Sequence, residues 1–199
     1  MTARLRRGII VGMEGSLEGR LLVASPTLLD PNFFRAVVYV VDHDEEGALG
    51  VILNRPSPVE LDEALAGWDG AASPPTRVFV GGPVQPEAAV CLARPRPGAG
   101  DIIGDAITLL PGGIASVDLD GDPALVASAI ESLRVFSGYA GWAAGQLDAE
   151  VDSGDWFVVD ALPGDVFDPD PDDLWRRVLG RQDGGLRLLA HFPALPVLN

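Results

Sequence analysis

The sequence predicts an α+β fold in a single domain, and three observations support this. Short apolar runs rich in β-branched residues follow one another and are bounded by turn residues, which is typical of strands. Only three or four segments combine helical spacing with a start signal, too few to alternate with the strands as in a doubly wound sheet. The 199 residues are 47% hydrophobic, enough for one buried core, and no internal repeat is visible.

Three strands are expected in the first quarter of the chain, at 21–24, 36–41 and 48–53. The acidic segment 42–47 joins the last two as a hairpin loop, in which Gly47 can adopt a positive φ. Asp30-Pro31 predicts a turn or single helical turn over 30–34, with Asp30 as the cap.

The next segment is predicted to be a short helix. Ser57-Pro58-Val59-Glu60 has the spacing of a capping box, with proline at the first helical position, so the helix would run to about Leu65. The stretch 67–76 is rich in Gly, Pro and Ser and is expected to be an exposed loop. Strands are then expected at 77–80, 88–93 and 106–109, with a proline-rich loop over 94–100.

In the second half, Asp122-Pro123 predicts a helix to about Leu133, since apolar residues recur at helical spacing. A strand at 135–142, a short helix at 145–151 and a strand at 156–159 are expected to follow. Asp170-Pro171 opens a last helix, which Gly180 closes.

The net charge of the chain indicates which classes of binding partner to expect. The formal net charge is -15, and a DNA-binding surface gains affinity by neutralising phosphates with cations, so direct DNA binding is not expected. A protein or a small anionic molecule is the expected partner. Arg4, Arg6 and Arg7 form one basic cluster, which is either a flexible tail or a phosphate-contacting arm. All basic residues are arginine, which excludes chemistry that needs a lysine, such as a P-loop or a Schiff base.

The sequence predicts a cytoplasmic protein. No secretory signal is present, and no apolar run approaches the roughly 18 residues that a membrane span needs. The single cysteine, Cys91, excludes an intramolecular disulfide and lies in an apolar strand, where a buried, inert thiol is expected.

No metal, cofactor or catalytic residue is predicted. The segment that starts at Asp42 resembles a calcium loop, but its twelfth position is Leu53, where a bidentate Glu is required. His43 and His191 lack further ligands at zinc-site spacing. A Gly-x-Ser-x-Gly elbow is also missing, although a triad can be assembled in space from distant residues.

A cleft for an anion is the candidate site. Gly81 and Gly82 follow a strand and would let backbone amides approach an anion, or would simply form a tight turn. Arg55, within Asn54-Arg55-Pro56, and Arg35 lie at strand ends and would line the same cleft, or would pair with Asp30 or Asp62 to fix loops. The full candidate set is Arg35, Asn54, Arg55, Gly81, Gly82, Tyr139 and Gln146.

Several motifs resemble the YqgE/AlgH family of small bacterial proteins. They are Asp30-Pro31, Asn54-Arg55-Pro56, Gly81-Gly82-Pro83 and Gly138-Tyr139-Ala140-Gly141-Trp142 followed by Gly145-Gln146-Leu147. The resemblance implies a strongly bent, mostly antiparallel, partly barrel-like sheet surrounded by helices. It covers 19–199 as one domain, whereas 1–18 would be an N-terminal extension and 94–100 is unusually rich in proline.

The family is labelled as candidate transcriptional regulators, and the resemblance implies neither an established active site nor a cofactor. The leading hypothesis is therefore a non-enzymatic cytoplasmic binding or regulatory domain. The alternative is an enzyme or small-molecule binder that acts on an anionic ligand at the arginine- and glycine-lined cleft.

Overall fold

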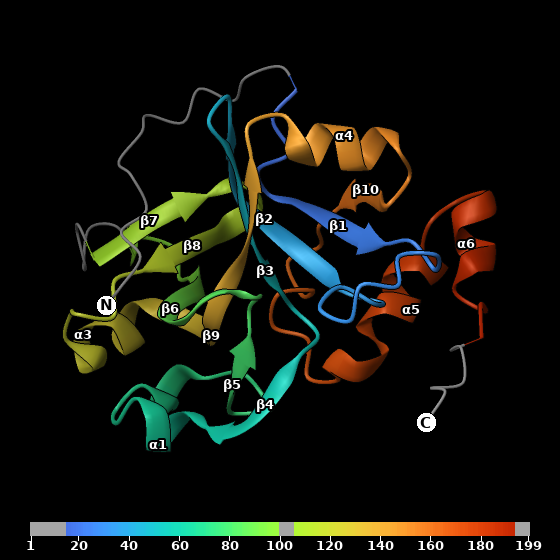
Figure 1. Ribbon diagram of the computed structural model, residues 1–199. Coiled ribbons are helices and arrows are strands. Elements are labelled where there is room, and N and C mark those ends of the chain that lie inside the picture. Colours follow the sequence, from blue (N-terminus) through green and yellow to red (C-terminus); the bar gives the residue numbers. More distant parts are fainter. Residues whose placement is uncertain (1–14, 100–105, 194–199) are drawn as a thin grey trace.

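A computed structural model describes residues 15–99 and 106–193 of the chain. In this part of the chain, ten strands form one sheet, and eight of them follow the order β10-β1-β2-β3-β9-β6-β8-β7 (Figure 1). Strands β4 and β5 extend from this path through a parallel contact between β5 and β9, in which Phe79 lies opposite Phe136. All other strand pairs are antiparallel.

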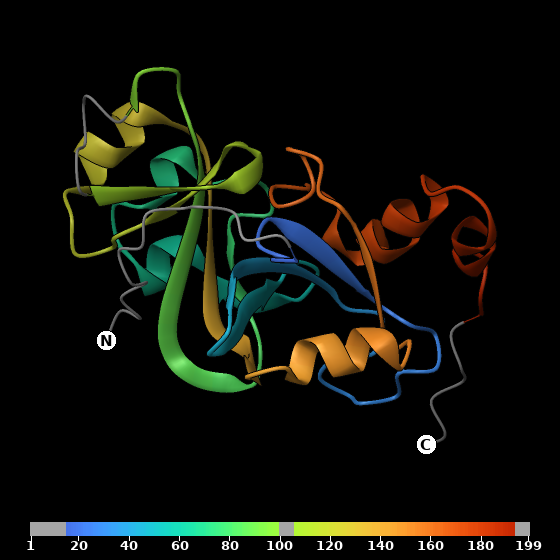
Figure 2. The same ribbon diagram turned by 90° about the horizontal axis from the view of Figure 1, so that it is seen from above.

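The sheet curls around two long strands, β6 (Val84–Pro95) and β9 (Ile130–Ala143). Their register shifts between Val84 and Ala89, where extra residues in β6 bulge and bend the strand (Figure 2). The predicted α+β class, with a bent, mostly antiparallel and partly barrel-like sheet flanked by helices, is confirmed.

The first predicted strands are also confirmed. They are β1 (Arg20–Ala24), β2 (Val37–Asp44) and β3 (Gly47–Ile52), and β1 pairs on its other side with β10 (Trp156–Asp160). The hairpin loop is shorter than predicted, because Asp42, His43 and Asp44 already pair with β3. Asp30 caps its turn as expected, since its side chain accepts a hydrogen bond from the Asn32 amide at 2.8 Å.

The helix predicted from the capping box at Ser57 is wrong. Residues Pro56–Glu60 form strand β4, which pairs with β5 (Arg77–Val80), and only Leu61–Ala64 form a helix, α1. The Ser57 hydroxyl does accept the Val59 amide, but this bond makes a local turn within the strand. Pairing with β5 and burial of Leu61 outweighed the local signal.

The helix that begins at Pro123 is shorter than predicted. Asp122 caps it by accepting the Ala124 amide at 2.9 Å, but α3 (Pro123–Ala129) ends four residues early, because β9 begins at Ile130 and pairs with β6. Two further elements were not predicted: strand β8 (Ile114–Val117), which pairs with β7 (Ile107–Leu110), and helix α6 (Gly185–Leu189).

Three hydrophobic clusters fill the two sides of the curled sheet. Helix α5 (Leu174–Gly180) packs into the largest cluster through Leu174, Trp175, Val178 and Leu179. Helices α1 and α3 cover a second cluster, and α4 (Gln146–Asp152) covers a third, which includes Trp142 and Trp156. Among the described residues, no helix is long and apolar enough to cross a membrane.

Candidate functional site

Asn54 fastens the 30–35 turn to the sheet. Its side chain is buried, accepts the Val37 amide at 2.9 Å and donates to the Arg35 carbonyl at 2.9 Å. An asparagine satisfies a backbone donor and a backbone acceptor at once, which explains why an amide rather than a carboxylate occupies this position. Asn54 therefore has a structural role at the end of β3.

Arg55 lies beside Asn54 and is also committed to backbone groups. Its guanidinium donates to the Phe34 carbonyl and, at 3.1 Å, to the Asn54 carbonyl. Burial lowers the pKa of Arg55, and the charge of Asp172 opposes this shift. The carboxylate of Asp172 thus lies near enough to Arg55 for an electrostatic interaction.

Arg35 has an unusual backbone conformation, with a φ of 54°, a left-handed value that non-glycine residues adopt uncommonly. Its guanidinium lies 4.7 Å from the Trp175 ring centre and donates to the Phe192 carbonyl at 2.5 Å. Burial, and then repulsion from Arg176, lower the pKa of Arg35. The side chain therefore joins the turn to α5 and to the residues after α6.

Gly81 and Gly82 are required by close backbone contact. A Cβ at Gly81 would lie 2.3 Å from the Gly138 carbonyl oxygen, and one at Gly82 would lie 2.2 Å from the Tyr139 carbonyl carbon. The Gly81 amide donates to the Ser137 carbonyl at 2.8 Å, and its carbonyl accepts from the Ile52 amide. The Gly81 amide is therefore paired with β9 and does not face an open anion site.

The last two predicted site residues lie on other elements. Tyr139 is opposite Val84 in the β6–β9 pair. Gln146 starts helix α4, where it accepts the Ala143 amide at 3.0 Å and donates to Glu150 at 2.9 Å. The structure thus joins Arg35, Asn54 and Arg55 by direct hydrogen bonds, and it leaves Gln146 in a separate group around Glu150.

Arg35 and Arg55 make no ion pair with Asp30 or Asp62 in the part of the chain that the structure describes. They fix loops as the structural alternative proposed, but through carbonyl oxygens instead of carboxylates. Sequence reasoning missed this because a backbone carbonyl leaves no signature in the sequence.

A groove begins directly after Arg55, between β4 and the segment that precedes α5. Its volume is about 440 Å³, and we call it the proline-lined groove. Five of its nine lining residues are prolines, and the full lining is Pro56, Ser57, Pro58, Pro75, Arg77, Pro169, Asp170, Pro171 and Asp172.

The charges around this groove are unevenly matched. Arg77 is paired with Glu60 at 2.6 Å, and Asp170 accepts from Arg177 at 3.1 Å. Asp172 is exposed and makes no hydrogen bond or ion pair with the other described residues. Although its charge acts on Arg55, Asp172 is therefore the carboxylate at the groove that is most available to a ligand.

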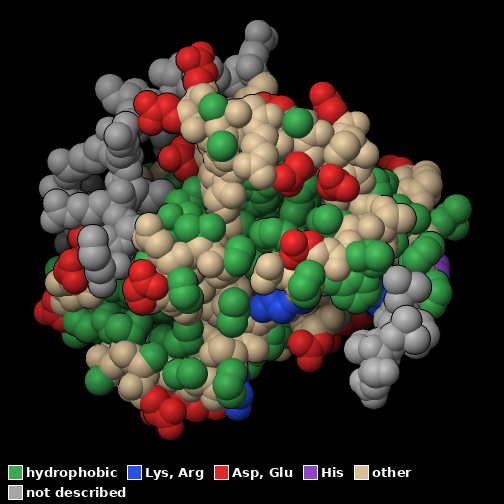
Figure 3. All heavy atoms as spheres, viewed as in Figure 1, with side chains coloured by type: hydrophobic (Ala, Val, Ile, Leu, Met, Phe, Trp, Pro, Cys, Tyr) green, Lys and Arg blue, Asp and Glu red, His purple; other side chains and the backbone are tan. Residues whose placement is uncertain are grey.

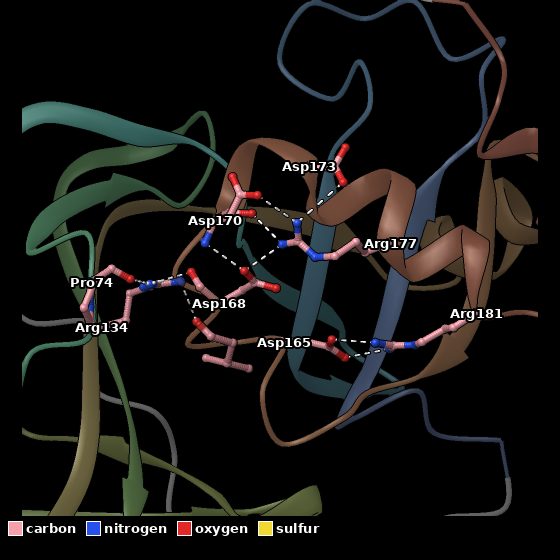
Figure 4. A network of polar contacts seen from close by, with 9 residues as sticks. Pro74, Arg134, Asp165, Asp168, Asp170, Asp173, Arg177 and Arg181 are labelled. Atoms are coloured by element: carbon pink, nitrogen blue, oxygen red, sulfur yellow. Dashed lines mark hydrogen bonds and ion pairs between the residues drawn. The ribbon is translucent and has the colours of Figure 1, made fainter.

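Arg134, which sequence reasoning also missed, anchors the segment behind the groove. It is buried on β9, lies 4.2 Å from the Phe79 ring centre, and donates to the carbonyls of Pro74, Val166 and Asp168 at 2.7 to 3.0 Å (Figure 4). Burial lowers its pKa to about 10, an effect that Asp168 opposes. A charged residue between Leu133 and Val135 in an apolar run was the signal that could have identified it.

Arg177 and Arg181 of the C-terminal region hold the same segment from the other side (Figure 4). Arg177 reaches the carboxylates of Asp168, Asp170 and Asp173 at 2.6, 3.1 and 3.6 Å, and these charges raise its pKa against the effect of burial. Arg181 makes a two-point contact with Asp165 at 2.6 and 2.7 Å. The segment 165–173 is thus fixed in place beside the groove.

No group of three or more His, Cys, Asp or Glu side chains in residues 15–99 and 106–193 could hold a metal ion. His43 instead secures the described part of the predicted N-terminal extension. Its Nδ1 accepts the Leu17 amide at 3.0 Å, and its carbonyl accepts the Ser16 hydroxyl.

Comparison with known proteins places the chain among relatives of similar length. Proteins named "UPF0301 protein" from Streptomyces avermitilis and Streptomyces coelicolor are each 50% identical to it, over 92% of this chain and 96% of theirs. A crystal structure of a Corynebacterium diphtheriae protein matches with a TM-score of 0.82 and 33% identity, over 87% of this chain and 91% of that one.

The solution structure of the AlgH protein from Pseudomonas aeruginosa matches with a TM-score of 0.67 and 31% identity, over 94% of this chain and 100% of that one. The family model described as AlgH-like matches residues 21–187, most of the chain. The resemblance predicted from the sequence motifs is therefore confirmed, and the chain belongs to the AlgH-like family.

Proposed function

We propose that this chain is a non-enzymatic cytoplasmic binding domain that works by contacting a partner protein, in a regulatory role. The proline-lined groove carries the proposal, because it is an open site with rigid walls and an exposed, available carboxylate. Rigid walls reduce the entropy lost on binding. The groove also lies next to Asn54-Arg55-Pro56, one of the motifs by which the family is recognised.

The charge of the molecule supports a protein partner over DNA. Acidic side chains are spread over the face shown in Figure 3, with few basic ones between them. Such a surface repels phosphates, so we expect no specific DNA complex. A mobility-shift series across salt concentrations tests this, since specific binding that weakens log-linearly with salt would contradict it.

Site-specific photo-crosslinking tests the proposed function. A photoreactive amino acid at position 57, on the groove wall, should yield a defined adduct with one protein, whereas the same amino acid at the exposed position 152 on α4 should not. The captured protein is then purified and titrated against this chain. Equal adducts at both positions, or an adduct whose purified partner shows no saturable binding, would count against the proposal.

The alternative function has weaker support. It is an enzyme or a binder of an anionic small molecule at the predicted site, which comprises Arg35, Asn54, Arg55, Gly81, Gly82, Tyr139 and Gln146. The guanidinium groups of Arg35 and Arg55 already donate to carbonyls, so an anion would have to displace these bonds. We expect no change in melting temperature across a panel of nucleotides and metabolites, because a ligand that binds the folded state raises it.

A further inference from the structure

The walls of the proline-lined groove suit a side chain with an apolar stem. Pro56 and Pro58 of β4 face Pro169 and Pro171 of the segment before α5, and Pro75 also lines the groove. Proline rings are rigid and apolar, so a ligand that packs against them does not have to order mobile side chains. An arginine stem is able to pack along such a surface while its charged guanidinium reaches a carboxylate at the edge.

The charge at the groove selects a cation. Arg177 pairs with the three carboxylates of Asp168, Asp170 and Asp173, and Arg134 adds one buried guanidinium beside Asp168. Carboxylates therefore still outnumber guanidinium groups in this segment. Asp172 adds a further exposed carboxylate at the groove itself; its charge acts on Arg55, but the two side chains form no ion pair. The arginine that lines the opposite wall, Arg77, is balanced by Glu60 at 2.6 Å. A positively charged group therefore complements the groove.

The molecule shows how its own segments bind guanidinium groups. Arg134 lies over Phe79 and donates to the Pro74 carbonyl, and Arg94 lies 5.3 Å from the Phe167 ring centre and donates to the Pro163 carbonyl. In both cases an aromatic ring lies under the guanidinium and a proline carbonyl accepts a hydrogen bond from it. The groove has proline rings in place of the aromatic ring, and it offers a carboxylate, which is a stronger acceptor than a carbonyl.

The groove is open rather than enclosed, because Pro58, Pro169, Asp170 and Asp172 are all exposed. A site of this shape covers one side of a polypeptide, whereas small-molecule sites bury most of their ligand. We infer that the proline-lined groove binds an extended segment of a partner protein through an arginine side chain, whose stem packs on the prolines and whose guanidinium pairs with Asp172. This inference rests on the proposed function and specifies the partner's chemistry.

Fluorescence anisotropy with a labelled peptide of Gly, Ser and Arg tests the inference, with peptides that carry Lys or citrulline in place of Arg as comparisons. We expect saturable binding in the order Arg, then Lys, with none for the uncharged citrulline peptide. Asp172→Asn should weaken binding of the Arg peptide about fivefold, because a partly exposed ion pair contributes up to about 1 kcal/mol.

Asp183→Asn is the matched control, since Asp183 is an exposed carboxylate outside the groove, and it should leave binding unchanged. Ser57→Arg places a competing guanidinium on the groove wall and should abolish binding, while circular dichroism verifies that each variant is folded. Equal affinity of wild type and Asp172→Asn, equal binding of the citrulline peptide, or no binding of the Arg peptide would overturn the inference.

These outcomes are distinct from failure of the proposed function. A partner that crosslinks at position 57 and binds Asp172→Asn as tightly as wild type would overturn the arginine-recognition inference and leave the binding function standing. If position 57 gives no specific adduct and the Arg peptide does not bind, both fail.

Discussion

Arg134 and Arg177 both contact Asp168, Arg134 through the backbone carbonyl and Arg177 through the side-chain carboxylate. Arg134 is buried and donates to the Asp168 carbonyl, whereas Arg177 is about one-third exposed and pairs with the Asp168 carboxylate (Figure 4). Arg134 has three carbonyl acceptors and an aromatic ring but no direct carboxylate partner. Arg177 has three carboxylates. The two arginines therefore differ both in burial and in the number of charged partners, and their contributions to stability show which property matters more.

Counting ion pairs alone would rank Arg177 as the more important residue. Physical chemistry predicts the reverse, because exposed pairs contribute little while loss of a buried charged group leaves its partners without hydrogen bonds and without water. Burial, more than the number of carboxylates, should therefore decide which arginine the fold depends on.

Replacement of Arg134 should have the largest effect. Arg134→Met leaves the buried carbonyl of Val166 and the part-buried carbonyls of Asp168 and Pro74 without this donor, so we expect a loss of about 3 kcal/mol in the free energy of unfolding. Urea denaturation measures it. Arg176→Met, at an exposed arginine of α5, is the control and should change stability by less than about 0.5 kcal/mol. Similar losses of stability in the two variants would contradict the expectation that the buried arginine matters more.

The Asp165–Arg181 pair is intermediate between the two extremes. The Asp165 side chain is only 7% exposed and accepts hydrogen bonds from both terminal nitrogens of Arg181. It also accepts a hydrogen bond from the Leu162 amide at 2.6 Å. Asp165→Ala should therefore cost about 2 kcal/mol in urea denaturation. Asp160→Ala is a suitable control, because the Asp160 carboxylate is largely exposed although it pairs with Arg20. A loss no larger than that of the control would place Asp165 with the surface pairs.

Cys91 shows what burial does to an ionisable group with no charged partner. Burial raises the pKa of its thiol above the ordinary value of 9.0, so the folded state keeps the proton while the unfolded state loses it. Stability should therefore fall as the pH rises above about 9, by about 1.4 kcal/mol per pH unit relative to Cys91→Ala. Parallel pH profiles of unfolding for the two proteins would contradict this.

Replacement of Arg177 should have the smallest effect. We expect Arg177→Ala to lower the free energy of unfolding by about 1 kcal/mol or less, since water screens the exposed pairs. The remaining loss should shrink further in high salt, which a urea series with added sodium chloride measures. A loss comparable to that of Arg134→Met, or one insensitive to salt, would show that Arg177 acts as a buried anchor.

The sequence predicted the strands better than the ends of the helices. Runs such as 36–41 and 48–53 form strands as expected, because alternation and bounding turn residues reflect burial directly. Ser57-Pro58-Val59-Glu60 carries a helix signal worth roughly 1 kcal/mol, which pairing with β5 readily outweighs. Helix α3 begins at its predicted start but ends where β9 pairs with β6.

The candidate site divides in a similar way. The sequence identified Asn54 and Arg55 as a unit, and the structure joins them to Arg35 and the 30–35 turn. It did not identify the groove that begins at Pro56, because its two walls are more than 90 residues apart in the chain. Gln146 lies in another group because helix α4 returns over a different part of the sheet.

By itself, the sequence determined the α+β class, the principal strands, the cap at Asp30, the helix start at Asp122-Pro123, and the family, since all of these are properties of local pattern and motif. Only the tertiary structure decided where the guanidinium groups point and which surfaces form the groove. An arginine has several hydrogen-bond donors and a long flexible stem, and every residue of the chain has a backbone carbonyl that can accept a hydrogen bond from it. The fold alone determines which of those carbonyls come within reach.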